Sequence, residues 1–555
     1  DLYFAAGHAS AALPEPQQQG AELVYGGPGA LFSLISGWRV AFDLFATAFC
    51  GGIYAVPLNA IMQHRSSPSK RSRVIAANNV INAIFMIGST LVSMVLLQTM
   101  TSRGLFLTLG IANAFAALWI CRLLPQELVA NLSRQIFRLF YRVEVKGLEH
   151  FAAAGRKAVI IANHTSMLDG PLLSAFLPER CGFAINTYMA QKWWVRPAFS
   201  LFDMIPIDPT NPMALRTLVD ELKKGRKIVI FPEGRLTVTG ALMKVYEGPG
   251  AIATMAGAKV LPVRIDGAQY STFSRMRGKL RLRWFPKVTV TFLPPVKFDA
   301  PEGLRGNALR EYQADKLYDV MTDMVFRTSN IGQTLFEALL DARATHGRQH
   351  QILEDIQRHP VTYDRLVAGS FVLGRKIARA TPGEKHVGVL LPNAIGCVLT
   401  IFGLHAFGRV PAMLNFSTGP INMAAACVAA QVSTIVTSRR FIEAGQMEED
   451  LKMLATGRKV IYLEDLRESV GLADKLYGLY AKSFAHTALR GAGASHDANS
   501  PAIILFTSGS EGVPKGVVLS HRNFHANRHQ AGARIAFTAQ DIVFNALPMF
   551  HAFGL

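Results

Sequence analysis

The chain has 555 residues, of which 50% are hydrophobic, and carries a formal net charge of +19. This length predicts about three or four domains at roughly 100–200 residues each, and the hydrophobic half excludes disorder as a general description. Charged residues make up 17% of the chain, below the ~25% of ordinary soluble proteins, which indicates a membrane portion. The five cysteines stand singly without a C-x-x-C pair, so neither a disulfide framework nor a structural zinc site is expected.

Three uncharged stretches lie in the first quarter of the chain, at 44–63, 74–102 and 104–121. Each is about long enough to cross ~30 Å of hydrocarbon as a helix. Lysines and arginines gather in the loop 64–73 and again after residue 122. The positive-inside rule therefore predicts a multi-pass membrane protein whose remaining domains lie in the cytoplasm.

Strand-like and helical patterns alternate in the rest of the chain, which is typical of α/β domains. Strands are predicted at 157–162, 227–231, 259–265, 288–293, 386–391, 434–437, 459–463 and 502–508, and a helix at 212–224. We therefore expect a multi-domain protein with transmembrane helices over 1–130, one α/β domain over 131–330 and part of a second over 331–555.

The excess of basic residues lies mainly in the middle domain, where 131–330 hold 29 lysines and arginines and 17 acids, a net charge of +12. No nucleic-acid recognition motif accompanies this charge, so nucleic acid is not an expected partner. Five of these cations alternate with other residues: Arg275, Arg277, Lys279, Arg281 and Arg283. On an extended segment they would share one face, either as a dock for an anionic leaflet or an acidic acyl carrier, or as a solvated edge strand.

The first chemical motif is His164, which stands five residues before Asp169. Five helical residues rotate by about 140°, so the two side chains meet only if His164 precedes a helix and Asp169 opens it. A predicted strand does end just before His164, and Ser166 is a candidate N-cap; a capping box from Ser166 to Asp169 is the simpler interpretation. The same spacing recurs without a preceding strand at His350 with Asp355 and at His359 with Asp364.

Two further motifs follow predicted strands. The strand 227–231 runs into Pro232-Glu233-Gly234-Arg235, where an acid and a base suit a phosphate and hydroxyls, or form a salt-bridged turn. The strand 502–508 runs into glycines, hydroxyls and a lysine that would wrap a polyphosphate, although the spacing is not that of a Walker A loop. Its residues are Thr507, Ser508, Gly509, Ser510, Gly512, Lys515 and Gly516.

Four blocks together resemble the glycerophospholipid acyltransferases of the lysophosphatidate acyltransferase type: Asn163–Asp169, Ile205–Pro209, Phe231–Arg235 and Val260–Val263. The resemblance implies that His164 takes the proton of a glycerol hydroxyl as it attacks an acyl thioester, and that Asp169 orients the imidazole. It also implies an acceptor-binding set, namely Asn163, Glu233, Gly234 and Arg235, with no metal and no cofactor for acyl transfer. The usual arginine of the second block is replaced by Pro209, which leaves the head group open.

The loop Thr507–Gly516 closely resembles the ATP loop of the AMP-forming acyl-activating enzymes, and Asn545–His551 resembles their next motif. The resemblance implies ATP and Mg²⁺ as cofactors, with the loop residues and His551 at the nucleotide and acyl site. The later motifs of that family do not follow before Leu555, and the sequence opens on Asp1 rather than on methionine. We therefore expect a segment lacking both natural ends.

Residues 57–79 resemble the lysophospholipid transporter branch of the major facilitator superfamily. The three parts in this order resemble bacterial acyl-[acyl-carrier-protein] synthetases fused to 2-acylglycerophosphoethanolamine acyltransferases. This implies a bacterial inner-membrane enzyme with a lysophospholipid acceptor and an acyl carrier protein or acyl-CoA as donor. The alternatives are a lysophospholipid transporter with regulatory domains, spans that serve only as an anchor, and a plain lysophosphatidate acyltransferase that uses acyl-CoA.

Overall fold

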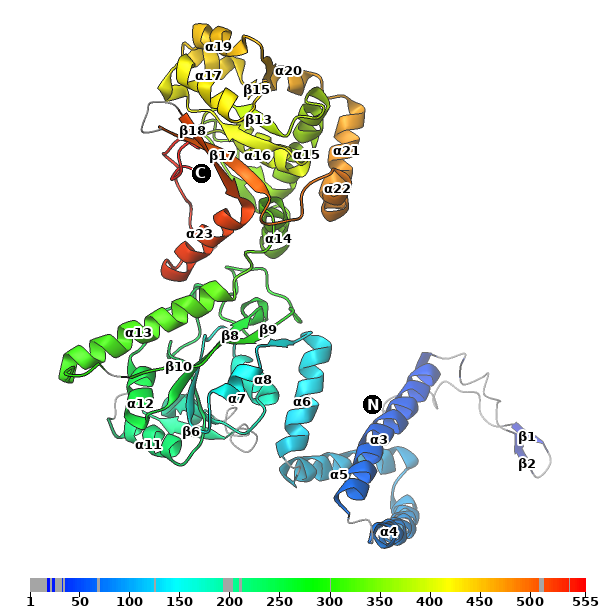
Figure 1. Cartoon of the computed structure of the whole chain (residues 1–555). Helices are drawn as coiled ribbons and strands as arrows, with labels where there is room; N and C mark the ends of the chain where they lie inside the picture. Colours follow the sequence, from blue (N-terminus) through cyan, green and yellow to red (C-terminus); the bar gives the residue numbers. More distant parts are fainter. Residues whose placement is uncertain are drawn as a thin grey trace. The chain divides into compact units, whose positions relative to one another are not determined.

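The computed structural model divides the chain into two compact units, Asp1–Pro125 and Gln126–Leu555 (Figure 1). The residues that it describes are 17–19, 22–24, 32, 35–66, 70–123, 126–192, 203–208, 212–299, 301–508, 514–538 and 540–555.

The first unit is mainly helical. It contains the strands β1 (Gln17–Gln19) and β2 (Glu22–Val24) and the helices α3 (Ile35–Arg65), α4 (Arg71–Thr99) and α5 (Ser102–Leu123). The three uncharged stretches thus fall on helices. Among the described residues, only α4 is long and apolar enough to cross a membrane, and none of its residues is buried within the protein. The multi-pass topology is therefore not confirmed and stays a prediction.

The second unit begins with an α/β domain built on one mixed sheet, whose strand order is β3-β9-β8-β4-β7-β5-β6 with β10 beside β8. The strands are β3 (Glu144–Lys146), β4 (Ala158–Ala162), β5 (Gly182–Asn186), β6 (Met204–Ile207), β7 (Ile228–Ile230), β8 (Lys259–Asp266), β9 (Thr289–Phe292) and β10 (Val296–Lys297). The helices are α6 (Gln126–Phe140), α7 (Glu149–Ala153), α8 (Asp169–Phe176), α9 (Thr187–Ala190), α11 (Pro212–Lys223), α12 (Gly248–Ala256) and α13 (Gly306–Arg327), with a 3₁₀ turn at Ala268–Tyr270.

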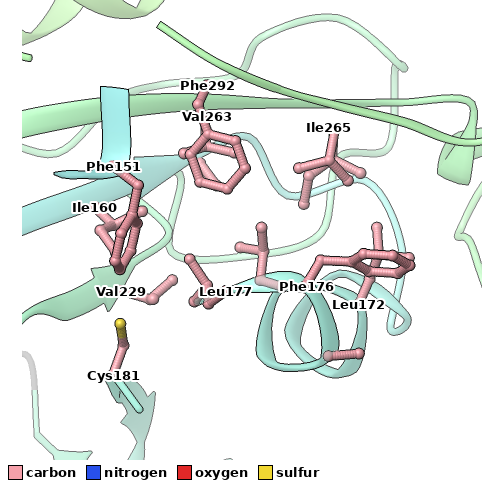
Figure 2. Close-up of a cluster of buried hydrophobic side chains, with 14 of the residues drawn as sticks. Phe151, Ile160, Leu172, Phe176, Leu177, Cys181, Val229, Val263, Ile265 and Phe292 are labelled. Carbon is pink, nitrogen blue, oxygen red and sulfur yellow. The ribbon is translucent and has the colours of Figure 1, made fainter. Parts of the chain in front are cut away.

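The central strand β4 shows why this domain forms a two-sided core. All five of its residues are fully buried, and successive side chains of a strand point to opposite faces of the sheet. Ile160 therefore joins a cluster with side chains of α7, α8 and β9, which Figure 2 shows. Val159 and Ile161 join the cluster formed with α11, α12 and α13. An uninterrupted apolar run is what a strand covered on both faces requires.

A second α/β domain follows, with the strand order β16-β15-β13-β14-β17-β18. Its strands are β13 (His386–Val389), β14 (Val410–Met413), β15 (Thr434–Thr437), β16 (Lys459–Tyr462), β17 (Pro501–Ser508) and β18 (Pro514–Ser520), and β11 (Gln351–Leu353) and β12 (Val361–Thr362) form a separate pair. All pairs in the main sheet are parallel except β17 with β18.

Most helices of this second domain lie between its strands, while the first precedes them and the last follows them. They are α14 (Leu335–His346), α15 (Tyr363–Ala380), α16 (Ile395–Ala406), α17 (Pro420–Ala429), α18 (Arg439–Ala444), α19 (Glu448–Ala455), α20 (Leu463–Glu468), α21 (Leu472–Ser483), α22 (Ala485–Gly491) and α23 (His521–Arg534), with a 3₁₀ turn at Phe416–Thr418. The eight predicted strands and the predicted helix 212–224 are all present, which confirms the α/β class of both domains.

The prediction of an extended segment over 275–283 is wrong. The chain there folds into successive turns, in which the N–H groups of Lys279 and Leu280 both donate to the carbonyl of Met276. Met276 is buried and anchors the segment, whereas all five cations remain exposed. They therefore form an exposed basic loop and not one face of a strand.

Candidate active site

His164 and Asp169 are in contact at the carboxyl end of β4. His164 Nδ1 lies 3.0 Å from Asp169 Oδ2, because β4 ends at Ala162 and α8 begins at Asp169. This is the strand, turn and helix arrangement that the spacing requires. The Asp169 side chain is 0% exposed and that of His164 is 23% exposed, so the carboxylate is sealed while the imidazole keeps an open edge.

The Asp169 carboxylate also accepts hydrogen bonds from the backbone of the turn between β4 and α8. Its Oδ2 also accepts hydrogen bonds from the backbone N–H groups of Thr165 and Ser166, at 2.6 and 2.8 Å. An ionised carboxylate only accepts hydrogen bonds, so His164 donates from Nδ1 and keeps the lone pair of Nε2 available.

Ser166 does not have the expected role of N-cap. The N-cap of α8 is Leu168, which makes no side-chain capping bond. The Ser166 hydroxyl instead lies 3.0 Å from the hydroxyl of Ser271 and accepts a hydrogen bond from the N–H of Leu168. Both hydroxyls are buried, so this pair ties the turn to the segment that follows β8.

The backbone and ring of His164 are fixed by the segment after β7. The imidazole stacks on the ring of Phe231, with centroids 4.2 Å apart. The His164 N–H donates to Glu233 Oε1 at 2.9 Å, and the His164 carbonyl accepts from the N–H of Thr237 at 2.8 Å. Sequence reasoning found Glu233 but missed Phe231 and Thr237 as neighbours of the histidine.

The four residues expected to bind the acceptor have different surroundings. Asn163 is 2% exposed and uses both ends of its amide on the backbone of Ile265, at 2.8 Å each. Glu233 is also 2% exposed, and its second oxygen accepts from the N–H of Met243 at 3.0 Å. Burial raises the pKa of Glu233, while the hydrogen bonds from the backbone N–H groups of His164 and Met243 lower it.

Gly234 and Arg235 lie at the surface of the same turn. Gly234 has a φ of +65°, and a Cβ there would come within 3.2 Å of the Tyr246 ring, so the position favours glycine. Arg235 is exposed, and within the described ranges its guanidinium has no carboxylate partner. It is the member of the set that is open to an anionic ligand.

The two other histidine–aspartate spacings form no pair. His350 stacks near Tyr363, while Asp355 accepts from the N–H groups of Gln357 and Ile395. Asp364 is engaged by Arg343 and Arg348, and His359 is exposed. Spacing alone is therefore uninformative, and the preceding strand was the useful signal.

The expected ATP loop joins β17 to β18. Thr507 and Lys515 face each other across these strands, and both are exposed. Ser508 ends β17 and Gly516 lies within β18. Gly509, Ser510 and Gly512 lie outside the described residues. A hydroxyl and an ammonium group at one end of a sheet suit the oxygens of a phosphate.

The segment that contains His551 is held by a residue that sequence reasoning missed. Asn393 Nδ2 donates to the carbonyls of Asn545 and Leu547, at 3.3 and 2.6 Å, and Oδ1 accepts from the N–H of Met549 at 2.9 Å. Asn393 follows β13 at its carboxyl end, the same sheet edge at which β17 ends. The Pro392-Asn393 pair after a buried strand was the available signal for a turn at this edge.

Comparisons with known proteins identify two domains. Residues 142–266 match the acyltransferase family, and residues 340–555 match the AMP-binding enzyme family. A 1-acyl-sn-glycerol-3-phosphate acyltransferase of Pseudomonas aeruginosa is 33% identical over 134 residues, which cover 23% of this chain and 51% of the relative. A sulfoacetate–CoA ligase of Cupriavidus necator is 30% identical over 210 residues, which cover 36% of each. The chain thus spans about half or less of these relatives.

Two solved structures are also similar. The 1-acyl-sn-glycerophosphate acyltransferase PlsC from Thermotoga maritima is 22% identical, with a TM-score of 0.26, and the match covers 38% of this chain and 88% of that chain. The O-succinylbenzoate coenzyme A synthetase MenE from Bacillus subtilis, in complex with AMP, is 20% identical with a TM-score of 0.30; the match covers 40% and 51% of the two chains. Neither family match begins before residue 142, so they do not bear on the predicted transporter part.

We predict that Asp169→Ala destabilises the first α/β domain, whereas Asp169→Asn retains most of its stability. Alanine leaves the N–H groups of Thr165 and Ser166 buried without an acceptor, at a cost of about 1–3 kcal/mol each, whereas the asparagine oxygen still accepts. Denaturant unfolding of the full chain, with hydrogen exchange of the α8 amides as the probe, measures the difference in stability between the variants. Asp220→Ala, at an exposed position of α11, is the control. Equal stability of Asp169→Ala and the control would contradict this account of the turn.

Proposed function

We propose that this chain, which joins an acyltransferase domain of the lysophosphatidate acyltransferase type to an AMP-binding domain of the acyl-CoA ligase type, re-acylates lysophospholipids. It would move a fatty acyl group from a thioester to the free hydroxyl of the acceptor. The observation that carries the proposal is the contact between His164 and the buried Asp169 at the end of β4.

The geometry supports general-base catalysis. An acyl thioester is already activated, so the reaction needs a group that takes the proton of the attacking hydroxyl. As the hydroxyl oxygen bonds to the acyl carbon, its proton passes to His164 Nε2, the carbon–sulfur bond breaks, and the leaving thiolate takes the proton back. The Asp169 carboxylate holds the imidazole by Nδ1 and stabilises it while it is positively charged.

The acceptor in this proposal is a lysophospholipid, with 2-acylglycerophosphoethanolamine as the expected one. The exposed guanidinium of Arg235 supports it, because a planar guanidinium binds phosphate oxygens through two parallel hydrogen bonds. The donor is an acyl carrier protein or coenzyme A thioester. The Pseudomonas aeruginosa relative of the first domain acts, by its name, on a 1-acyl-sn-glycerol-3-phosphate, and the assignment of a lysophospholipid acceptor to this chain is ours.

The second domain is proposed to activate fatty acids with ATP. Thr507 and Lys515 lie opposite each other at the end of β17 and would hold the phosphates through a hydroxyl and an ammonium group. Magnesium would accompany the nucleotide, because Mg²⁺ binds phosphate oxygens and needs few protein ligands. His551, held near the same edge through Asn393, is the proposed neighbour of the acyl group.

Membrane contact is proposed to involve α6 and the basic loop, residues 271–285. Leu132, Ile136 and Leu139 recur along α6 and are all exposed, which is the pattern of an interfacial helix. The ring of Phe140 lies 4.9 Å from that of Phe285, at the end of the loop. At its other end, Ser274 pairs with Ser166 in the catalytic turn. An apolar stripe and five exposed cations suit the anionic cytoplasmic leaflet of a bacterial inner membrane.

We expect His164→Ala to reduce acyl transfer by about 10²–10⁴-fold, the usual contribution of a general base. The assay uses membranes that carry the protein, labelled lysophospholipids, and either acyl-CoA or acylated carrier protein. His350→Ala and His359→Ala are matched controls and should keep full activity. A lysophospholipid transporter with regulatory domains would not depend on His164, so retention of more than about half the activity would exclude the proposed mechanism.

We expect Lys515→Ala to weaken Mg·ATP binding by about 10–150-fold, because one charged contact to a phosphate is worth on the order of 1.5–3 kcal/mol. Equilibrium binding of a fluorescent ATP analogue to the full chain measures the change. Lys475→Ala on α21, which removes another exposed lysine, is the control. Unchanged affinity for Mg·ATP in Lys515→Ala would show that Lys515 does not bind the nucleotide.

Membrane contact is tested by flotation with vesicles that contain anionic or only zwitterionic lipids. Replacing Arg277, Lys279 and Arg281 by glutamate should reduce recovery with anionic vesicles several-fold, because each cation near such a surface contributes about 1 kcal/mol. Leu476→Glu, which changes an exposed apolar residue of α21, is the control. Equal recovery of the triple variant and the native chain would show that the basic loop does not face the lipid.

A further inference from the structure

We infer that Glu233 is a positioning residue that fixes the backbone of His164 and that it does not bind the acceptor. This inference rests on the proposed acyl transfer, in which His164 is the base. It replaces the simpler expectation that Glu233 and Arg235 together hold the glycerophosphate.

Both carboxylate oxygens of Glu233 are engaged inside the protein. Oε1 accepts from the N–H of His164 at 2.9 Å, and Oε2 accepts from the N–H of Met243 at 3.0 Å. The residue is 2% exposed, so a substrate hydroxyl has almost no access to either oxygen. A buried carboxylate needs hydrogen bonds to offset its desolvation, and these two backbone N–H groups favour the charged form, although burial still raises the pKa of Glu233.

The same segment holds His164 from its other side. The N–H of Thr237 donates to the carbonyl of His164 at 2.8 Å. Residues 233–243, here named the clamp segment, therefore bond to both the N–H and the carbonyl of one residue. Phe231, just before this segment, stacks on the imidazole. The position of the base thus depends on the clamp segment as much as on Asp169.

The clamp segment also carries Arg235, between Glu233 and Thr237. Because Glu233 and Thr237 are both bonded to His164, the backbone of Arg235 between them is held at a set separation from the base. Glu233 therefore aligns the base with the backbone that carries the arginine, without contacting the acceptor. A displacement of about 1 Å between such groups can cost about 10²-fold in rate.

The test compares kcat and KM in the full chain with lysophospholipid as the varied substrate. Glu233→Gln is nearly the same size but offers one acceptor oxygen in place of two, so one N–H group loses its partner. We expect kcat to fall about 10–100-fold and KM to stay within about twofold, because the base is misplaced while the anion site stays open. Arg235→Ala is the matched contrast and should raise KM about tenfold or more.

A second pair of variants addresses the case in which Glu233→Gln does not fold. Met243→Pro removes the backbone N–H that donates a hydrogen bond to Glu233. Met243→Ala keeps this N–H and removes only the side chain. We expect the proline variant to show the same loss of kcat at unchanged KM, and the alanine variant to behave like the native chain. A merely structural role would lower the melting temperature without this separation of kcat from KM.

The outcomes distinguish this inference from the proposed function. If Glu233→Gln raises KM as Arg235→Ala does and leaves kcat unchanged, Glu233 contacts the acceptor and the inference is wrong. Full activity in Glu233→Gln, or in Met243→Pro, overturns it as well. If His164→Ala stays active, the proposed function itself fails, whatever the result at Glu233.

Discussion

The candidate acyltransferase site depends on one buried carboxylate oxygen with three donors. Asp169 Oδ2 accepts from the imidazole of His164 and from the N–H groups of Thr165 and Ser166. The two backbone bonds shape the turn, and the third orients the ring. Because a single oxygen receives all three, the turn and the histidine cannot be placed independently. The burial of Asp169 prevents water from competing for these bonds.

The sheet explains why this turn lies where it does. β4 is apolar and fully buried, so polar residues such as Asn163 and His164 can follow only where the strand ends. β7 and β8 run parallel to β4 on its two sides, and their carboxyl ends lead to Glu233 and to Ile265. The neighbours of β4 thus supply the bonds that fix His164 and Asn163. The same rule places Thr507 and Asn393 at one edge of the second sheet.

Much of the fold was predictable from the sequence because both sheets are central and apolar. Strands such as 157–162 and 434–437 read as buried runs, and the pairing of His164 with Asp169 followed from a strand before the motif. β14 was missed, because Val410–Met413 is short and contains Pro411. The loop 275–283 has a period-two pattern of charge, yet the buried side chain of Met276 and its local hydrogen bonds favour turns.

The contact between His164 and Asp169 could be predicted from the sequence, but most bonding partners of the other candidate residues could not. Glu233 was identified from its motif, whereas its bonds to His164 and Met243 join residues that are far apart in the sequence or separated by an irregular segment. Such tertiary contacts leave no local pattern. The same holds for Ser166, whose hydroxyl pairs with Ser271 and not with its own helix. Asn393 carries a turn signal but nothing that indicates its contact with residues 545–549.

Under the proposed acyl transfer, the turn that holds His164 also bears on the competition between transfer and hydrolysis. The open edge of His164 belongs to a turn that continues into Met167, whose N–H bonds to the carbonyl of Phe273, and both of these apolar side chains are exposed. A base that can activate a glycerol hydroxyl can equally activate water, which is far more concentrated. In the proposed acyl transfer, selectivity for the lipid would require this surface to be covered, and a bilayer would supply both the cover and the acceptor.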